Sequence, residues 1–455
     1  MPLMSGHSLP QPFDPRATLA RRADRSISQE DFLCDVRRLA EALPEAVGAF
    51  NLCEDRYRFA VAFAALLLRG QVNLLPPNRA TDSLAGIART QPGCYALVDH
   101  IDPRLPVPQV AVDEAGTTHS LPPAPPSGPL DIPPGQTAVL AFTSGTTGQP
   151  TPHAKTWGQL VESTRQAMDR FGLDRGEPPA LVATVPAQHM YGLESAILYA
   201  LRGQGVLVAE RPFFPEDIRA ALGVQAGALL ITTPFHLAAC LRAGLHWPTP
   251  RMILCATAPL DAALAREAER QFRCPLMEIY GCTEAGAVAS RRTTADTTWR
   301  TYEEVRLLPP NPAEPEVTRL QGPQHPAPVP LQDHVLPLDS ERFGLGERFS
   351  DQLNIAGKRA SLADLNLRLR GIEGVLDGVF IPPENVEPGA VARLAALVVA
   401  PGLDETRILE ALARAIDPAF LPRPLILLDR LPRSSTGKLP RRLLLDLLAT
   451  HQQCA

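Results

Sequence analysis

Residues 143–155, TSGTTGQPTPHAK, place four hydroxyl side chains and two glycines in six positions directly after the apolar run 138–142. Such a loop at a strand end can bring backbone N–H groups close to phosphate oxygens, because glycine lets the main chain approach unhindered. It is not a Walker loop, since the sequence has no G-x-x-x-x-G-K-[ST] motif. On these residues alone, a phosphate-binding loop and a polar surface turn remain alternative interpretations.

Composition narrows the class of protein. The chain has 455 residues, 45% of them hydrophobic, which is enough for two or more domains. The formal net charge is -5 with acidic and basic residues interspersed, which argues against a nucleic-acid binder. The eight cysteines are scattered singly without a C-x-x-C pair, so reduced thiols in a cytoplasmic protein are the simplest account.

The sequence shows no targeting or membrane segment. Its N-terminus lacks the charged and apolar regions of a secretory signal. The longest apolar run, residues 59–68, is shorter than the roughly 20 residues that cross a bilayer. We expect this run to be a core helix in a protein with no membrane span.

The elements that must position the first loop lie between two proline-rich stretches, residues 103–134 and 309–330, expected to be extended connectors or surface loops. Strand-like runs alternate there with longer helix-like runs, which predicts an α/β fold with much parallel sheet. The strand-like runs are residues 138–142, 181–185, 205–209, 228–232, 252–256 and 275–280. The loops TSGTTG, PAQHMYG, TPFH, ATAPL and YGCTEAG follow strands, and we expect them to converge on one cleft, because ligands bind at the carboxyl ends of parallel strands.

From about residue 351 the sequence changes character. A basic, glycine-punctuated hairpin-like piece precedes an amphipathic helix. A strand-like run at 393–399, a helix at 404–416 and the basic loop LPRSSTGK follow, the last ahead of a short apolar helix. These features predict a small α+β domain on a hinge.

Three motifs in this order resemble the adenylate-forming enzymes: TSGTTG-x-P, YG-x-TE and P-R-[ST]-x-[ST]-G-K, with a G-x-R segment before the third. This superfamily includes acyl- and aryl-CoA synthetases, adenylation domains of peptide synthetases and firefly luciferase. The resemblance covers nearly all of the chain after about residue 45. It implies a large multi-sheet N-terminal α/β domain, residues 1–350, and a small mobile α+β C-terminal domain, residues 351–455, hinged at Asp351.

The resemblance also implies a reaction. A carboxylate attacks the α-phosphate of ATP, pyrophosphate leaves, and a thiol then expels AMP from the acyl adenylate. Bringing anions together requires positive charge and N–H donors at the transferring group. Within the superfamily, PHAKTW at residues 152–157 is similar to the ligases of aryl polyene and xanthomonadin pigment clusters, which load an aromatic acid onto an acyl carrier protein.

The superfamily motifs assign nucleotide contacts, with ATP and Mg²⁺ as cofactors. Residues that wrap the β- and γ-phosphates are Thr143, Ser144, Gly145, Thr146, Thr147 and Gly148. The usual lysine after the proline is replaced by Thr151, and Lys155 either supplies that charge or is an ordinary surface lysine. Tyr280 would stack on adenine, Thr283 would bond the α-phosphate, and Glu284 would help hold Mg²⁺, a hard cation that prefers oxygen ligands.

Further nucleotide contacts follow from the same alignment. The turn Ala256, Thr257 and Ala258 would flank the adenine, and Asp333 and Arg348 would bind the ribose hydroxyls, although the residues around both depart from the superfamily pattern. Lys438 matches the lysine that bridges the incoming carboxylate and the α-phosphate, a role suited to a compact charge on a long stem.

The acid pocket is assigned in the same way. Its expected residues are His189, Tyr191, Phe235, Ala256, Ile279, Gly281 and Gly286. Small residues at 281 and 286 leave room for a flat ring, so the expected substrate is a small carboxylic acid, preferably aromatic. The preferred thiol is that of an acyl carrier protein, with free CoA as the alternative acceptor.

A retired adenylate-binding protein is a more distant alternative, suggested by Thr151 and the altered ribose motif. Glu284 and Lys438 argue against it, because a retired enzyme has no reason to keep both.

Overall fold

The computed structural model describes residues 7–22, 25–112, 128–144, 150–173, 175–311, 314, 317–331, 333–348, 352–355, 358–382, 393–416, 418–434, 437 and 439–453. The chain divides into two compact units. Unit 1 comprises Met1–Ala313, Thr318–Leu331 and Pro337–Gly344, and unit 2 comprises Glu314–Val317, Gln332–Leu336 and Leu345–Ala455. The expected hinge, Asp351, lies outside the described residues, so it stays a prediction.

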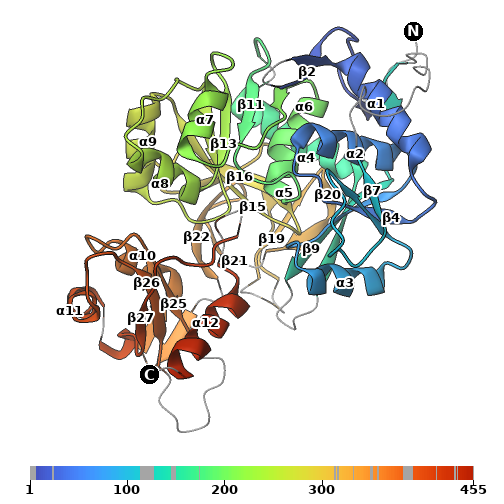
Figure 1. The fold of residues 1–455 in the computed structure, drawn as a ribbon. Coiled ribbons are helices and arrows are strands. Elements are labelled where there is room, and N and C mark those ends of the chain that lie inside the picture. Colours follow the sequence, from blue (N-terminus) through green and yellow to red (C-terminus); the bar gives the residue numbers. More distant parts are fainter. Residues whose placement is uncertain are drawn as a thin grey trace. The chain divides into compact units, whose positions relative to one another are not determined.

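Most strands of an 11-stranded sheet form the framework of unit 1 (Figure 1). Across the sheet its strands are β21 (Asp333–Pro337), β22 (Arg342–Arg348), β17 (Trp299–Thr301), β16 (Gly286–Arg291), β15 (Leu276–Cys282), β14 (Met252–Cys255), β13 (Leu229–Thr232), β11 (Ala180–Ala183), β12 (Val206–Val208), β2 (Thr18–Arg21) and β3 (Ser26–Ser28). The consecutive strands β15, β14, β13, β11 and β12 pair in parallel. They coincide with five of the expected strand runs, and the predicted α/β class is confirmed.

Three helices cover one face of these parallel strands: α7 (Pro215–Leu222), α8 (Pro234–Arg242) and α9 (Ala262–Phe272) (Figure 1). Each starts at a local sequence signal. Proline occupies the first turn of α7 and α8, where its missing N–H costs nothing. Asp261 caps α9 by accepting the N–H groups of Ala263 and Leu264. The helices bury apolar side chains such as Leu237 and Phe272 against the strands, which fixes the loops at the strand ends.

A second, six-stranded sheet holds the phosphate-loop sequence. Across the sheet its strands are β10 (Pro150–Thr156), β9 (Thr137–Ser144), β5 (Val72–Leu75), β4 (Gly48–Asn51), β6 (Tyr95–Val98) and β7 (Gln109–Ala111). After β9 the chain returns as the antiparallel strand β10, with Ser144 opposite Pro150. The expected strand at 138–142 is therefore present, but its loop leaves a different sheet from the other four loops.

Helix α2 (Arg56–Leu68) explains the long apolar run. It contacts β4 and β5 of the six-stranded sheet and β12 of the 11-stranded sheet. Nearly all of its side chains are buried, because apolar partners lie on both sides. The prediction of a core helix at 59–68 is confirmed. Among the described residues, no helix has both the length and the apolar character needed to cross a bilayer.

The remaining helices of unit 1 are α1 (Gln29–Ala42), α3 (Thr81–Thr90), α4 (Trp157–Phe171), α5 (Met190–Gly192) and α6 (Tyr199–Leu201). A π-helical segment, η1 (Leu193–Leu198), joins α5 to α6. Helix α4 begins at a capping box in which Thr156 and Gln159 exchange hydrogen bonds. This cap sets the point where β10 ends and the chain turns away.

The second proline-rich stretch, residues 309–330, was wrongly expected to be an extended connector or surface loop without strands. It contains β19 (Arg319–Gly322) and β20 (His325–Pro330), which form a small sheet with β18 (Arg306–Leu307). Strand β20, HPAPVP, lies at the edge of this sheet, the position where proline is tolerated in a strand. Another short pair joins β1 (Ser8–Leu9) to β8 (Leu130–Asp131).

Unit 2 has the expected α+β composition. A hairpin, β23 (Gln352–Ile355) with β24 (Lys358–Ser361), precedes α10 (Leu362–Arg370). A three-stranded sheet of β25 (Asp377–Ile381), β26 (Ala395–Val399) and β27 (Leu425–Leu427) follows, with α11 (Glu405–Ala415), the 3-10 turn η3 (Pro418–Phe420) and α12 (Arg441–Gln453). Helices α10 and α11 pack on one side of β26 through Leu369 and Leu412, and α12 packs on its other side through Leu444.

Candidate active site

His153 brings two of the predicted motifs together. Its Nε2 atom lies 3.1 Å from Thr143 Oγ1, the first residue of the phosphate-loop motif, and 3.7 Å from Glu284 Oε1 of the second motif. The His153 and Glu284 side chains are 18% and 25% exposed, so the contact remains accessible to a ligand. The expected convergence of the first and last of the five loops is therefore observed at these residues.

Several of the residues predicted to contact ATP lie outside the part of the chain that the structure describes. The loop residues Gly145, Thr146, Thr147 and Gly148, and Lys438 of the third motif, are not among the described residues. Ser144 ends β9, and Arg348 ends β22, with only their backbones described. Their roles stay predictions.

Lys155 is not an ordinary surface lysine, which was one of the two interpretations of the sequence. It is 5% exposed, and its Nζ donates to the backbone carbonyl oxygen of Glu284. Strand residues two apart share a face, so Thr151, His153 and Lys155 follow one another along one side of β10. Along this face burial increases from the exposed Thr151 to the half-buried His153, which reaches Thr143 and Glu284, and to the buried Lys155. Burial lowers the pKa of Lys155, and the charge of Glu194 is the main opposing influence.

Glu194 is a buried carboxylate on the π-helical segment η1. Its Oε1 accepts a hydrogen bond from Ser163 Oγ, and its Oε2 accepts one from Ala287 N, both at 3.1 Å. Burial raises the pKa of Glu194, and the nearby Lys155 charge opposes this shift. π-Helical turns are rare and occur frequently at functional sites, which makes this placement informative.

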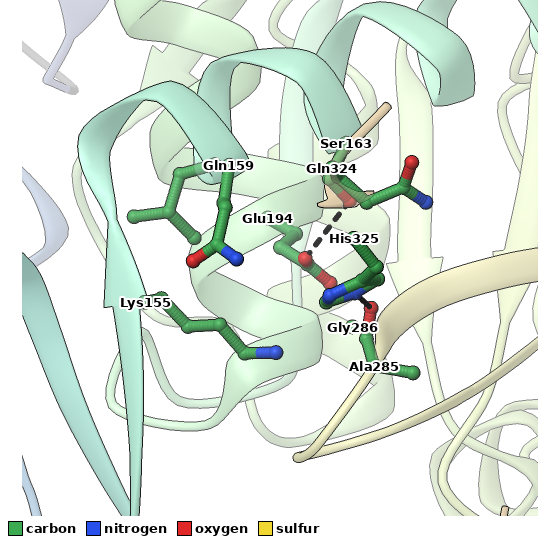
Figure 2. A pocket seen from close by; sticks show the side chains of 9 residues that line it. Lys155, Gln159, Ser163, Glu194, Ala285, Gly286, Gln324 and His325 are labelled. Carbon is green, nitrogen blue, oxygen red and sulfur yellow. Dashed lines mark hydrogen bonds between the residues drawn. The ribbon is translucent and has the colours of Figure 1, made fainter. Parts of the chain in front are cut away.

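These side chains line a small polar cavity (Figure 2). Its walls are Lys155, Gln159, Leu160, Ser163, Glu194, Ala285, Gly286, Gln324 and His325. The His325 Nε2 atom lies 2.7 Å from the carbonyl oxygen of Ala285, and because a carbonyl only accepts, Nε2 carries the proton. Burial lowers the pKa of His325, which favours the neutral ring. The cavity has room for about one water molecule, so it is too small for an organic acid.

The second motif forms the end of β15 and the turn to β16. Thr283 and Glu284 lie in this turn, half-buried. Tyr280, the expected adenine platform, is 6% exposed, and its ring packs against Trp299 and Phe343 at 5.6 and 5.5 Å between centroids. Burial raises the pKa of Cys282 to about 12, so this thiol stays protonated and is no nucleophile at neutral pH.

The turn expected to flank adenine carries two unusual features. Thr257 has a φ of 84°, a left-handed conformation that is rare for a β-branched residue. Its buried Oγ1 has no hydrogen-bond partner among the described residues. Strained residues cluster at ligand sites, and an unpaired buried hydroxyl needs an explanation, but the role of this turn toward adenine stays a prediction. Ala256 is buried beside it, and Ala258 is exposed.

The residues predicted to line the acid pocket differ in their burial and in the contacts that they make. His189 caps α5, and its Nδ1 accepts the N–H of Tyr191 at 3.3 Å. The Tyr191 hydroxyl donates to the carbonyl oxygen of Leu254 at 2.8 Å, a bond that ties α5 to β14. Phe235 is 38% exposed and packs on His236. Ile279 is buried.

The two glycines expected to make room for a ring have another role. A Cβ on Gly281 would lie 2.3 Å from the carbonyl oxygen of Gly286, so the two hairpin strands approach too closely for a side chain. Gly286 has a φ of 71°, and its Cβ would lie 2.5 Å from Glu194 Oε1. Backbone geometry and the Glu194 carboxylate therefore account for both glycines without a ligand.

Asp333, the predicted ribose contact, is the first residue of β21 and is 8% exposed. It belongs to unit 2, whereas Thr143, Thr283 and Glu284 belong to unit 1. Its role toward ribose stays a prediction.

The donor set fits Mg²⁺ only together with phosphate. Within the described ranges, no group of three or more His, Cys, Asp or Glu side chains could hold a metal ion. Mg²⁺ in nucleotide sites is bound through one or two carboxylates plus phosphate oxygens, and Glu284 offers one such carboxylate.

The sequence interpretation missed three residues of this region: His153, Glu194 and His325. Glu194 could have been found, because a lone carboxylate within the apolar stretch LESAILYAL must have a partner when buried. His153 stands two residues after Thr151 on a strand, so it shares the face that lost the superfamily lysine. Nothing in the sequence marks His325.

A protein family and several CoA ligases are similar to this chain in sequence. The family described as AMP-binding enzyme matches residues 12–317, about two thirds of the chain. A 4-coumarate–CoA ligase of Rhodobacter capsulatus is 32% identical over 302 residues, covering 64% of this chain and 70% of that protein. The peroxisomal OPC-8:0-CoA ligase 1 of Arabidopsis thaliana is 23% identical over 357 residues, covering 70% of this chain and 65% of that protein.

Solved structures share the fold. The o-succinylbenzoate CoA synthetase of Bacillus subtilis, in complex with an acyl-adenylate intermediate, aligns with a TM-score of 0.79 at 18% identity, covering 95% of this chain and 96% of that one. ATP-bound MatB of Rhodopseudomonas palustris aligns with a TM-score of 0.77 at 18% identity and the same coverage. The chain belongs to the AMP-binding enzyme family, within the adenylate-forming superfamily that its three motifs indicated.

Proposed function

We propose that this protein is an ATP-dependent acid–thiol ligase that forms an acyl adenylate and transfers the acyl group to a thiol. The observation that carries the proposal is the meeting of Thr143 and Glu284 at His153, which joins two motifs far apart in the sequence. A site for an acid and a triphosphate needs hydroxyl and N–H donors beside a carboxylate that can share Mg²⁺. These groups are present together in unit 1.

Each group has a role in the first half-reaction. Bound ATP would supply the α-phosphorus that the carboxylate attacks, with Mg²⁺ neutralising phosphate charge. Thr143 offers a hydroxyl to the phosphates, and Glu284 offers a carboxylate to Mg²⁺. The unpartnered Thr257 hydroxyl lies on the turn assigned to the adenine. We assign to Lys438 the charge between the acid and the α-phosphate, from its motif. In the second half-reaction, a C–S bond forms, the acyl C–O bond breaks and AMP leaves.

An aromatic acid is the proposed substrate. Support comes from the relative in Rhodobacter capsulatus, whose name specifies 4-coumarate. Acid-dependent exchange of pyrophosphate into ATP tests the assignment, with 4-coumarate, 4-hydroxybenzoate and octanoate as probes. We expect exchange with an aromatic acid. Exchange with octanoate alone would overturn the aromatic assignment, and no AMP formation across a broad acid panel would favour the retired adenylate-binding protein.

The proposed acceptor is the phosphopantetheine thiol of an acyl carrier protein, on the strength of the PHAKTW resemblance. Free CoA is the second candidate, supported by the names of the CoA-ligase relatives. Mass spectrometry of thioester products, with CoA and a holo carrier protein offered in separate reactions, distinguishes the two. A neighbouring gene for a carrier protein would favour the first, and catabolic oxygenase genes the second. ATP and reduced thiols fit the proposed cytoplasmic location.

A further inference from the structure

The turn that carries Glu284 is held from three separate elements. Lys155 of β10 donates to the carbonyl oxygen of Glu284, and His325 of β20 donates to that of Ala285. Glu194 of η1 accepts the N–H of Ala287 at 3.1 Å. Three of the turn's backbone groups are thus fixed by charged or imidazole side chains, all 5% exposed. Figure 2 shows Lys155, Glu194 and His325 around the cavity. A short turn with so many side-chain partners has little freedom to reorient.

The geometry of the turn depends on these side chains. Gly286 adopts a φ of 71°, and only the lack of a Cβ allows the Glu194 carboxylate to approach its backbone. Ser163 donates to the other Glu194 oxygen at 3.1 Å, which fixes the direction of the carboxylate. Lys155 binds the backbone of the same residue whose carboxylate lies near His153. A change at Lys155 therefore acts directly on the placement of Glu284.

The cavity that these residues line has room for about one water molecule. It therefore supports the neighbouring turn and does not bind a substrate. Buried charges are costly unless they are hydrogen-bonded and compensated. Water or neutral donors could satisfy the buried backbone groups of the turn. That a buried lysine and a buried glutamate bind them instead indicates that the turn must keep a fixed geometry.

We propose that Lys155, Glu194 and His325 are positioning residues that hold the Glu284–Ala287 turn from its buried side, so that Glu284 is pre-oriented toward Mg²⁺ and phosphate. This inference rests on the proposed function of Glu284. It assigns to Lys155 a role other than direct replacement of the cation missing at Thr151. Residues that orient metal ligands typically contribute about 10- to 100-fold to metal affinity or activity, and an effect of this size is expected here.

The test compares Lys155→Met and Glu194→Leu with Arg202→Met. Arg202 serves as the control in unit 1, because it is a half-buried cation that donates to the backbone carbonyl of Ser8 and to Gln11 Oε1, and not to the turn. Adenylation is measured by pyrophosphate exchange with 4-coumarate or 4-hydroxybenzoate over a range of Mg²⁺ concentrations. We expect Lys155→Met to lower the exchange rate about 10- to 100-fold and raise the Mg²⁺ requirement, with the KM of the acid unchanged. Glu194→Gln should retain more activity than Glu194→Leu, because its amide oxygen still accepts the Ala287 N–H.

Amide hydrogen exchange of peptides spanning residues 283–288 gives a readout that needs no turnover. We expect faster exchange in Lys155→Met and Glu194→Leu than in the wild type, and no change in Arg202→Met. If folded Lys155→Met matches Arg202→Met in exchange protection and in Mg²⁺ dependence, the residues merely satisfy buried groups and the proposal is wrong. If the wild type activates none of the acids but the turn loosens and Mg²⁺–ATP binding weakens in Lys155→Met, the proposed substrates fail while the positioning role stands.

Discussion

The His153 Nε2 atom lies 3.7 Å from Glu284 Oε1, and this contact joins the antiparallel hairpin of one sheet to the strand-end turn of another. The same nitrogen lies 3.1 Å from Thr143 Oγ1. His153 occupies the face of β10 on which Thr151 replaces the superfamily lysine. We therefore predict that the imidazole contacts the phosphates in place of that lysine.

His153→Ala should lower kcat/KM for Mg²⁺–ATP roughly 10- to 100-fold, the effect of losing one hydrogen bond to a charged group. Steady-state adenylation kinetics measure this loss. Adding Thr151→Lys to the His153→Ala variant should restore part of the activity, since residue 151 is exposed on the same face. Unchanged kinetics in His153→Ala would remove the residue from the site.

Lys438→Ala should separate the two half-reactions. Adenylation should fall about 100- to 1000-fold, because the lysine contact develops in the transition state. Thioester formation from chemically supplied acyl-AMP should survive nearly intact, because the lysine has no role once the adenylate exists. Asp351→Pro should spare adenylation and block transfer if residue 351 is the hinge, since proline fixes φ. Equal loss of both half-reactions in Lys438→Ala would contradict the inference that Lys438 acts only in adenylation.

Gly286→Ala should destabilise the fold more than Gly70→Ala. Both glycines have positive φ, 71° and 69°, but a Cβ at residue 70 meets nothing within 4 Å, whereas one at residue 286 would collide with Glu194. Gly70→Ala should cost about 1–2 kcal/mol, and Gly286→Ala about 1–3 kcal/mol more. Denaturant unfolding with a constant m-value measures both. Equal losses would show that the Glu194 carboxylate moves aside freely.

His236 should make the free energy of unfolding depend on pH. Burial, with a further contribution from Arg211, lowers its pKa to about 4, whereas an unfolded histidine titrates near its ordinary value of 6.5. Between these values the unfolded chain binds the extra proton, so stability is fully present above about pH 6.5 and falls by up to about 3 kcal/mol toward pH 4.

His236→Gln should flatten this part of the stability curve. The test is denaturant unfolding between pH 4 and pH 7, compared with His246→Gln at an exposed histidine. A wild-type slope that survives His236→Gln would assign the pH dependence to other groups.

Periodicity was sufficient to locate the parallel strands and the central helix. The runs at 228–232 and 252–256 became β13 and β14 with boundaries shifted by a residue. Short uninterrupted apolar segments are typical of strands in a buried parallel sheet. Glycine, hydroxyl and acidic residues at the ends of β9 and β15 likewise indicated the site. Local residue composition is therefore enough to place these strands, the central helix and the loops of the site.

The missing parts depend on contacts between distant segments. The sequence could not show that β9 belongs to a second sheet, because strand pairing is decided by tertiary packing. Lysine is a residue type that usually lies at the surface. Position 155 is buried only because β10, η1 and β20 converge there. Prolines at 326, 328 and 330 indicated a connector, because proline is tolerated in a strand only at an edge and the sequence does not show which strand lies at an edge.

Those prolines also bear on how the edge of β20 could associate with a second chain. The N–H of Leu331 bonds inward to Thr318, and Pro330 stands opposite Arg319, so residue 330 directs its nitrogen atom away from β19. The register is irregular opposite residues 326–328, but proline at 326, 328 and 330 leaves half of the strand's residues without an N–H group to offer an added strand. An exposed edge invites pairing with a second chain, and proline is one of the ways in which native sheets prevent it. The edge strand β20 of the small sheet, with its sequence HPAPVP, is thus poorly suited to intermolecular strand addition.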